Sequence, residues 1–207
     1  MSLPQLTLAS GSPQRRQLLT DAGVDFDILI PHESAECGVC STGGPAAYVA
    51  ELAHRKAANV AHQLTDSSES QTAARILIAC DTVAECRGSI LGKPKDEDHA
   101  RHMLEQLRGT THRVFSGLCL WPYNTDQFGD PDTRVASTEL RMDEISDAQL
   151  DEYLASELWW GKAGAFGYQD RIDWLHISQG SETNVIGLPM ELLTEMLNAH
   201  GYTFGSL

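Results

Sequence analysis

The sequence feature that most constrains the fold is a short apolar segment that leads directly into a helix start. Residues 5–9 (QLTLA) have the length and composition of a buried strand, and the turn residues 10–12 (SGS) interrupt it. Ser12 suits a helix N-cap because its hydroxyl can accept a hydrogen bond from a free backbone N–H group. Pro13 suits the first helical position because it has no N–H group to leave unpaired. The pattern therefore predicts a strand, a tight turn and a helix in succession.

Strand and helix patterns alternate through the rest of the chain. Strands are expected at residues 24–30, 75–79, 111–121, 133–142 and 174–177, with a hairpin at 83–91, and helices at 13–22, 46–63, 96–107, 146–156 and 186–199. Turn residues join the segments 111–121 and 133–142, which predicts a long antiparallel pair. Neither a repeat nor a linker interrupts the series. We expect a single α/β domain over residues 1–207, with a central mixed sheet flanked by helices and a cleft at the strand ends.

The charge of the chain narrows its partners. Lysine and arginine number 15 against 29 acidic residues, a formal net charge of −14. A surface this acidic repels polyanions, so we expect neither nucleic acid nor an anionic membrane as a partner. No apolar run approaches the roughly 18 residues of a membrane-spanning helix. A small anionic substrate is compatible with this charge if the few cations gather in one cleft.

Two features favour a cytoplasmic location. The chain has five cysteines, an odd number, which is typical of reduced thiols rather than of a disulfide framework. Residues 1–16 also lack a basic start before a long apolar stretch, the pattern of a secretory signal.

The turn at residues 10–12 has the composition of an anion site. The first backbone N–H groups of a helix are free and lie at the positive end of its dipole. Ser10 and Ser12 add hydroxyl groups, and Arg15 and Arg16 add planar guanidinium groups that match phosphate oxygens. A capped helix with two solvated arginines explains the same residues about equally well.

Asp81 follows the apolar segment 75–79, which we expect to end as a strand at residues 80–82. Ligands of α/β proteins collect beyond the carboxyl ends of strands. A carboxylate at that position can hold Mg²⁺ or activate water. The alternative is an aspartate that only initiates a turn.

The segment 159–167 is unusual in composition. Lys162, one of four lysines, precedes the small-residue run AGAFG. Such a run lets a ligand approach the backbone closely, or packs tightly between strands. We interpret the preceding Trp159 and Trp160 as packing residues rather than as a platform for a nucleotide base, because tryptophan mostly provides buried surface.

Six segments match, in order, the motifs of one known family. They are LASGSPQRRQLL (8–19), LAHRKA (52–57), ACDTV (79–83), ILGKP (90–94), KAGAFGYQ (162–169) and VIGLP (185–189). This series, which spans nearly the whole chain, resembles the Maf family of nucleotide pyrophosphatases. The resemblance implies a Maf/ITPase-like fold and a cytoplasmic, house-cleaning enzyme, often a homodimer, that uses Mg²⁺ or Mn²⁺. Its reaction would convert nucleoside triphosphates to the monophosphate and pyrophosphate.

The resemblance also implies roles for individual residues. The phosphate-binding residues would be Ser10, Ser12, Arg15, Arg16, Lys56 and Lys93. Asp81 would be the proton acceptor or a metal ligand that orients the attacking water. The family has an acidic residue after its second strand, and here Glu36 is the first choice for that metal-binding carboxylate and Glu33 the second.

Three positions distinguish two branches of the family. These positions lie directly after the Ser-Pro pair, directly after the aspartate, and in the late motif. The branch that prefers dTTP and UTP has Arg, Thr and Gln at them, and the branch that prefers 7-methyl-GTP has Trp, Gln and Glu. This chain has Gln14, Thr82 and Gln169, which is closer to the dTTP/UTP branch. Gln14 matches neither, because an amide lacks the charge and the five donors of a guanidinium.

We expect Gln14 and Gln169 to govern base choice. The alternatives are an enzyme for 7-methyl-GTP or for a broad range of modified nucleotides, and a nucleotide-binding regulator of cell division without turnover. Asp81 separates the last of these from an enzyme, since a pure binder has no use for a carboxylate that faces a triphosphate.

Overall fold

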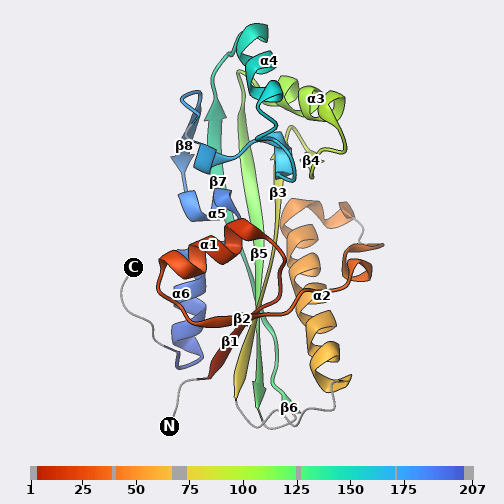
Figure 1. Cartoon of the computed structure of the whole chain (residues 1–207), viewed down its shortest axis with the longest axis vertical. Coiled ribbons are helices and arrows are strands. Elements are labelled where there is room, and N and C mark those ends of the chain that lie inside the picture. Colours follow the sequence, from red (N-terminus) through yellow and green to blue (C-terminus); the bar gives the residue numbers. More distant parts are fainter. Residues whose placement is uncertain (1–3, 39–40, 67–73, 125–126, 171, 203–207) are drawn as a thin grey trace.

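One mixed sheet of eight strands forms the centre of the molecule (Figure 1). The computed structural model describes residues 4–38, 41–66, 74–124, 127–170 and 172–202. The strands are β1 (Gln5–Leu8), β2 (Phe26–Ile28), β3 (Arg75–Cys86), β4 (Ser89–Leu91), β5 (Thr111–Asn124), β6 (Gln127–Phe128), β7 (Asp132–Met142) and β8 (Leu175–Gln179). Their order is β2-β1-β3-β5-β7-β8, with β4 paired to β3 and β6 to β5. Among the described pairs, β1 with β2 and β1 with β3 are parallel, and the others are antiparallel. The prediction of a single α/β domain with a mixed sheet is confirmed.

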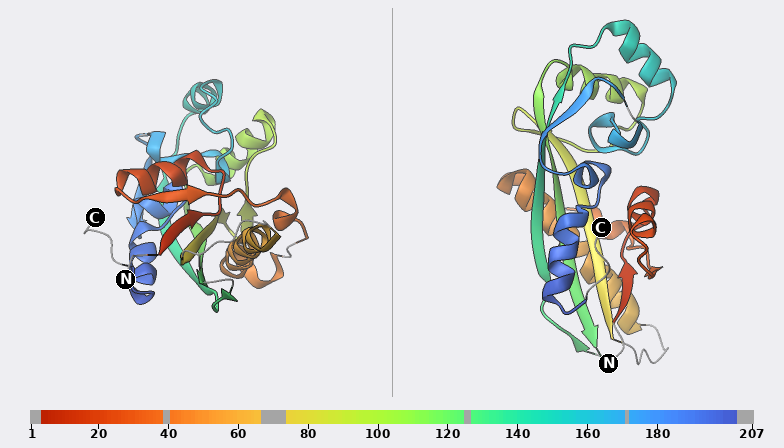
Figure 2. Two further views of the ribbon diagram at one scale, coloured as in Figure 1. Left: turned by 60° about the horizontal axis from the view of Figure 1, so that its bottom comes forward. Right: turned by 90° about the vertical axis from the view of Figure 1, so that its left-hand side faces the viewer.

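Helices cover both faces of this sheet. They are α1 (Pro13–Asp21), α2 (Gly44–Asp66), α3 (Glu97–Leu107), α4 (Asp147–Ala155), α5 (Glu182–Ile186) and α6 (Met190–Ala199). Short 3₁₀ turns are η1 (Glu33–Glu36), η2 (Ser41–Gly43), η3 (Ala163–Ala165) and η4 (Tyr168–Asp170). Helix α2 lies on one face, α1 and α6 lie on the other, and α3 and α4 pack at the far end of the long strands (Figures 1 and 2). Among the described residues, no helix combines the length and the apolar character needed to cross a lipid bilayer.

The alternation of side chains along β3 assigns each residue to one of these faces. Leu77 and Ala79 pack with alanines of α2, whereas Ile78 and Cys80 pack with the apolar side chains of α6. Because the period of a strand is two residues, Asp81 then points to the side of α2 and the next residue to the side of α1.

Strand β3 is longer than the sequence pattern predicts. Residues 75–85 pair without interruption with the antiparallel β5, and β3 ends only at Cys86. The prediction that this strand ends at residues 80–82 was wrong, because a complete ladder with β5 carries the chain through the polar pair Asp81-Thr82. Asp81 therefore lies inside a strand and not beyond its end.

The other edge of β3 has an opening at the same place. Strand β1 pairs with β3 only as far as Leu8, opposite Ile78, and β4 begins its pairing opposite Ala84. Residues 79–83 thus have a strand neighbour on one side only. The carboxyl end of β1 opens onto Thr82, which lines the expected cleft, whereas Asp81 points to Lys56 on α2 and is not among the residues that line it.

A glycine sets how closely α2 approaches the sheet. A Cβ atom on Gly117 of β5 would lie 2.1 Å from the carbonyl oxygen of Val49 and 2.7 Å from the backbone nitrogen of Ala50. Both partners are backbone atoms of α2 and cannot rotate away. The position of α2, and of every side chain it carries, therefore depends on the absence of a side chain at Gly117.

We expect Gly117→Ala to lower the free energy of unfolding by about 2–3 kcal/mol, because one methyl group must force a helix away from a close-packed sheet. Urea unfolding followed by circular dichroism measures this change. Gly92→Ala is the matched control, since a Cβ atom there would meet nothing within 4 Å. Equal unfolding midpoints for the two variants would contradict the packing argument.

Candidate active site

A cleft of about 450 Å³ opens beyond the carboxyl end of β1. Its lining brings together nine of the residues singled out from the sequence: Ser10, Ser12, Gln14, Arg15, Glu36, Lys56, Thr82, Lys93 and Gln169. The turn between β1 and α1 and the segment 160–169 supply much of this lining. Side chains that are distant in the sequence therefore face one space.

Local hydrogen bonds shape the turn before α1. The backbone N–H of Arg15 donates to the hydroxyl of Ser12 at 3.4 Å, which makes Ser12 the N-cap, as predicted. The backbone N–H of Ser12 donates to the hydroxyl of Ser10 at 3.2 Å. The Ser12 hydroxyl donates in turn to Oε1 of Gln14 at 3.0 Å. These contacts order the first turn of α1 at the mouth of the cleft.

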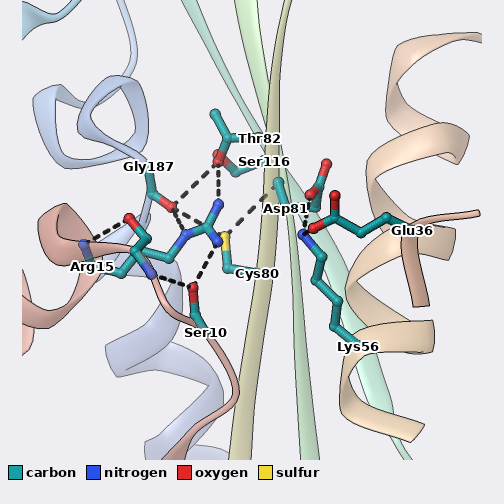
Figure 3. Close-up of polar contacts among 10 residues, drawn as sticks. Ser10, Arg15, Glu36, Lys56, Cys80, Asp81, Thr82, Ser116 and Gly187 are labelled. Carbon is teal, nitrogen blue, oxygen red and sulfur yellow. Dashed lines mark hydrogen bonds and ion pairs between the residues drawn. The ribbon is translucent and has the colours of Figure 1, made fainter. Parts of the chain in front are cut away.

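Arg15 is held entirely by neutral acceptors (Figure 3). Its guanidinium donates to the carbonyl oxygen of Gly187 at 2.8 Å, to Ser10 Oγ at 3.1 Å and to Thr82 Oγ1 at 3.3 Å. Within the described residues, no carboxylate pairs with it. Its position is fixed while its positive charge stays unneutralised, which is the arrangement that favours an incoming anion.

A break between two helices supplies one of these acceptors. The sequence predicts a single helix over residues 186–199, but α5 ends at Ile186 and α6 begins only at Met190. Gly187 adopts φ +127°, a conformation that favours glycine, and Pro189 precedes the new helix. The break presents the carbonyl oxygen of Gly187 to Arg15 and to Thr82. Because the sequence predicts an unbroken helix here, it does not predict this contact.

Three charged side chains meet on the opposite side of β3 from Arg15 (Figure 3). The ammonium of Lys56 lies 2.6 Å from Oδ1 of Asp81 and 2.8 Å from Oε1 of Glu36. Lys56 belongs to α2 and is only 6% exposed. A buried ammonium is stable only when counter-charges surround it. In this structure Lys56 lines the cleft and holds two carboxylates together, and its role in phosphate binding stays a prediction.

The charges around Glu36 shift its ionisation. Partial burial by itself raises its pKa, but the hydrogen bond and charge of Lys56, with the charges of Lys93 and Arg15, bring the pKa of Glu36 below its usual value. Glu36 is therefore held as a carboxylate.

The donor set suits a hard divalent cation bound jointly with a phosphate. Glu36 and Asp81 already converge on one cation, the ammonium of Lys56. Among the residues that the structure describes, no three His, Cys, Asp or Glu side chains form a metal cluster. Mg²⁺ commonly binds through one or two carboxylates and substrate phosphates, which fits this pair. Glu33, the second choice from the sequence, is exposed and does not line the cleft.

Two more predicted residues, Lys93 and Arg16, lie in different places relative to the cleft. Lys93 is exposed and lines the cleft, after the hairpin of β3 and β4. Arg16 is exposed and lies outside the lining, and its contact with phosphate stays a prediction. Consecutive helical residues point about 100° apart, and Arg15 already occupies the direction that faces the cleft.

The sequence did not identify one ion pair at the edge of the cleft. Lys162 lines the cleft, and its ammonium lies 2.7 Å from Oδ1 and 2.5 Å from Oδ2 of Asp170. Gly167 leaves room for the pair, since a Cβ atom there would lie 2.6 Å from both partners. The scarcity of lysine and the small-residue run after Lys162 were the available signals, but neither indicates a partner eight residues away.

Comparison with known proteins identifies the class to which this architecture belongs. The family model described as "Maf-like protein" matches residues 5–200. The chain is 49% identical to a dTTP/UTP pyrophosphatase of Rhodopirellula baltica, covering 93% of this chain and 80% of that protein. It is 38% identical to a dTTP/UTP pyrophosphatase of Pelotomaculum thermopropionicum, covering 97% and 98%. The Ham1 protein of Staphylococcus aureus aligns with a TM-score of 0.49 and 12% identity over 95% of this chain and 99% of that one. The chain belongs to the Maf-like protein family.

The depressed pKa of Glu36 predicts how stability depends on pH. A carboxyl group whose folded pKa lies below its unfolded value stabilises the protein above that unfolded value, here 4.5, and loses the contribution as pH falls further. We expect Glu36→Gln to lower the melting temperature by a constant amount above about pH 5.5, and this difference to shrink below pH 4.5.

Thermal unfolding of wild type and variant from about pH 3 to about pH 7 measures this difference. Glu33→Gln is the control, because Glu33 is exposed and outside the cleft. A difference between wild type and Glu36→Gln that stays constant down to the lowest pH would contradict the role of Lys56.

Proposed function

We propose that this chain hydrolyses dTTP and UTP to the nucleoside monophosphate and pyrophosphate. The observation that carries the proposal is that an unneutralised guanidinium, Arg15, lies on one side of β3, and two carboxylates, Glu36 and Asp81, lie on its other side. A triphosphate needs cations for its oxygens, and its hydrolysis needs a carboxylate near the attacked phosphorus. The names of the relatives, dTTP/UTP pyrophosphatase, support the same reaction.

The phosphate groups bind at the turn before α1. Ser10, Ser12 and Arg15 contribute hydroxyl groups and the guanidinium. Pro13 has no N–H group and that of Arg15 is donated to Ser12, so the first helical turn adds the N–H group of Gln14. Lys93 approaches from the hairpin of β3 and β4 and stabilises charge that develops on the leaving pyrophosphate.

Asp81 accepts the proton of the attacking water. The water oxygen forms a bond to the α-phosphorus, the bond from that phosphorus to the bridging oxygen of the β-phosphate breaks, and pyrophosphate departs. Lys56 is a positioning residue, since its ammonium fixes Asp81 and Glu36 in one orientation at 2.6 and 2.8 Å.

Glu36 and Asp81 are the residues that would hold Mg²⁺ or Mn²⁺. A divalent cation there would supply charge neutralisation for the phosphate oxygens. The proposal includes a cytoplasmic location and a house-cleaning role, and a homodimer stays a prediction of the family resemblance.

The products and the metal requirement test the reaction. We expect UMP and pyrophosphate in equal amounts, so that orthophosphate is detected only after inorganic pyrophosphatase is added. Excess EDTA should abolish turnover, because Glu36, Asp81 and Lys56 together keep a net negative charge that repels a triphosphate when no divalent cation is bound. The screen should include 7-methyl-GTP and modified triphosphates. Orthophosphate release without the coupling enzyme, or full activity in EDTA, would refute the proposal.

Asp81→Asn separates catalysis from binding. We expect kcat to fall by a factor of about 10² or more, the usual scale for the loss of a general base, while KM changes little or falls. Steady-state kinetics with UTP measures both constants. The control is Asp151→Asn, which removes a surface carboxylate paired with Arg101 and should leave kcat unchanged. A near-normal kcat in Asp81→Asn would remove Asp81 from the mechanism.

Gln169 tests base choice. It lies exposed on the cleft wall, where its amide can both donate to and accept from the O4 and N3–H edge of uracil or thymine. A mismatched edge leaves polar groups unpaired at a cost of about 1–3 kcal/mol for each. We expect Gln169→Glu to lower kcat/KM for UTP and dTTP by more than it does for GTP and 7-methyl-GTP. An equal fall for all four substrates would show that Gln169 is structural.

A further inference from the structure

The two neighbouring tryptophans have opposite environments. Trp159 is 5% exposed, and its indole N–H donates to the carbonyl oxygen of Leu154 at 2.9 Å. Trp160 is 64% exposed and lines the cleft. The interpretation of both residues as packing residues is therefore correct for Trp159 and wrong for Trp160, whose indole buries little surface in this chain.

The backbone fixes the position of Trp160 although its side chain is exposed to solvent. The turn that carries it includes Glu157 at φ +57° and Gly161 at φ +72°. The N–H of Trp160 donates to the carbonyl oxygen of Glu157 at 3.1 Å, and the N–H of Lys162 donates to that of Trp159 at 3.2 Å. The two indole rings meet edge to face, with centroids 5.4 Å apart and planes at 70°. Trp160 is thus an anchored aromatic surface that faces solvent.

The surroundings of Trp160 differ from those of the phosphate-binding turn. Ser10, Ser12 and Arg15 belong to the turn before α1, whereas Trp160 shares the segment 160–169 with Phe166 and Gln169, and the one cation of that segment, Lys162, is already paired with Asp170. A nucleoside triphosphate also has a charged part and an aromatic part. The lining offers a different segment to each part, and among its described residues only Trp160 is an exposed aromatic ring.

We propose that Trp160 is the platform on which the substrate's pyrimidine base stacks, an inference that rests on the proposed function. Stacking uses the π face that every base has, so it supplies affinity, whereas the amide of Gln169 reads the polar edge. Trp160 is a specificity and affinity residue and takes no part in the cleavage of the phosphate anhydride.

Steady-state kinetics of Trp160→Ala test the platform. We expect KM for UTP to rise about tenfold, the scale of one lost base-stacking contact, with kcat changed by less than about twofold. Trp160→Phe should restore most of the affinity, because it keeps an aromatic face. Leu158→Ala is the matched control: Leu158 is 45% exposed in the same turn but does not line the cleft.

Inorganic tripolyphosphate separates the two halves of the substrate, because it has the phosphates and no base. Its inhibition constant should be the same in wild type and in Trp160→Ala. An equal weakening of tripolyphosphate and of UTP would mean that the variant disturbs the phosphate site, and it would overturn the proposal. An unchanged KM for UTP would overturn it as well.

Calorimetric binding of the α,β-methylene analogue of UTP, which cannot be cleaved at that bond, keeps the two proposals distinguishable. If wild type binds the analogue tightly and Trp160→Ala binds it about tenfold more weakly, the platform stands even in a chain without turnover. If wild type turns over UTP and Trp160→Ala binds the analogue equally well, the proposed function stands and the platform is wrong. A lower molar mass of Trp160→Ala in light scattering, with unchanged affinity, would assign the exposed indole to a contact between two copies of the chain and overturn the proposal.

Discussion

The uninterrupted pairing of β3 with β5 is the constraint on which the site depends. It carries β3 past the end of β1, so that residues 79–83 keep one strand neighbour and leave the other edge open. The pleat of the strand then sends Asp81 toward α2 and Thr82 toward α1. A shorter β3 would place both side chains in a loop, where their directions would not be fixed.

Two cations that line the cleft, Arg15 and Lys56, have opposite surroundings. Arg15 receives only neutral acceptors, so its full charge is available to a ligand. Lys56 forms ion pairs with two carboxylates, so its charge is neutralised and holds them in place. Both arrangements are needed in an acidic chain of net charge −14, because one attracts an anion and the other prevents two nearby carboxylates from repelling each other.

Backbone irregularities position the groups that the regular elements cannot reach. Gly187, between α5 and α6, presents a carbonyl oxygen to Arg15, which is 172 residues away in the sequence. Gly161 and Glu157, both at positive φ, turn the chain so that Trp159 is buried and Trp160 is exposed. Such positions cost conformational energy and persist only where the surrounding packing determines them.

The sequence by itself determined the strand, turn and helix at residues 5–21, because the N-cap of Ser12 and the ring of Pro13 act within one turn of chain. It also determined the mixed sheet and which motifs face one cleft. Only the tertiary structure decided that Arg15 rather than Arg16 faces the cleft, that Lys56 joins Asp81 to Glu36, and that Asp81 lies within a strand. These outcomes depend on contacts between segments that are distant in the chain, and local propensity carries no information about which partner will arrive.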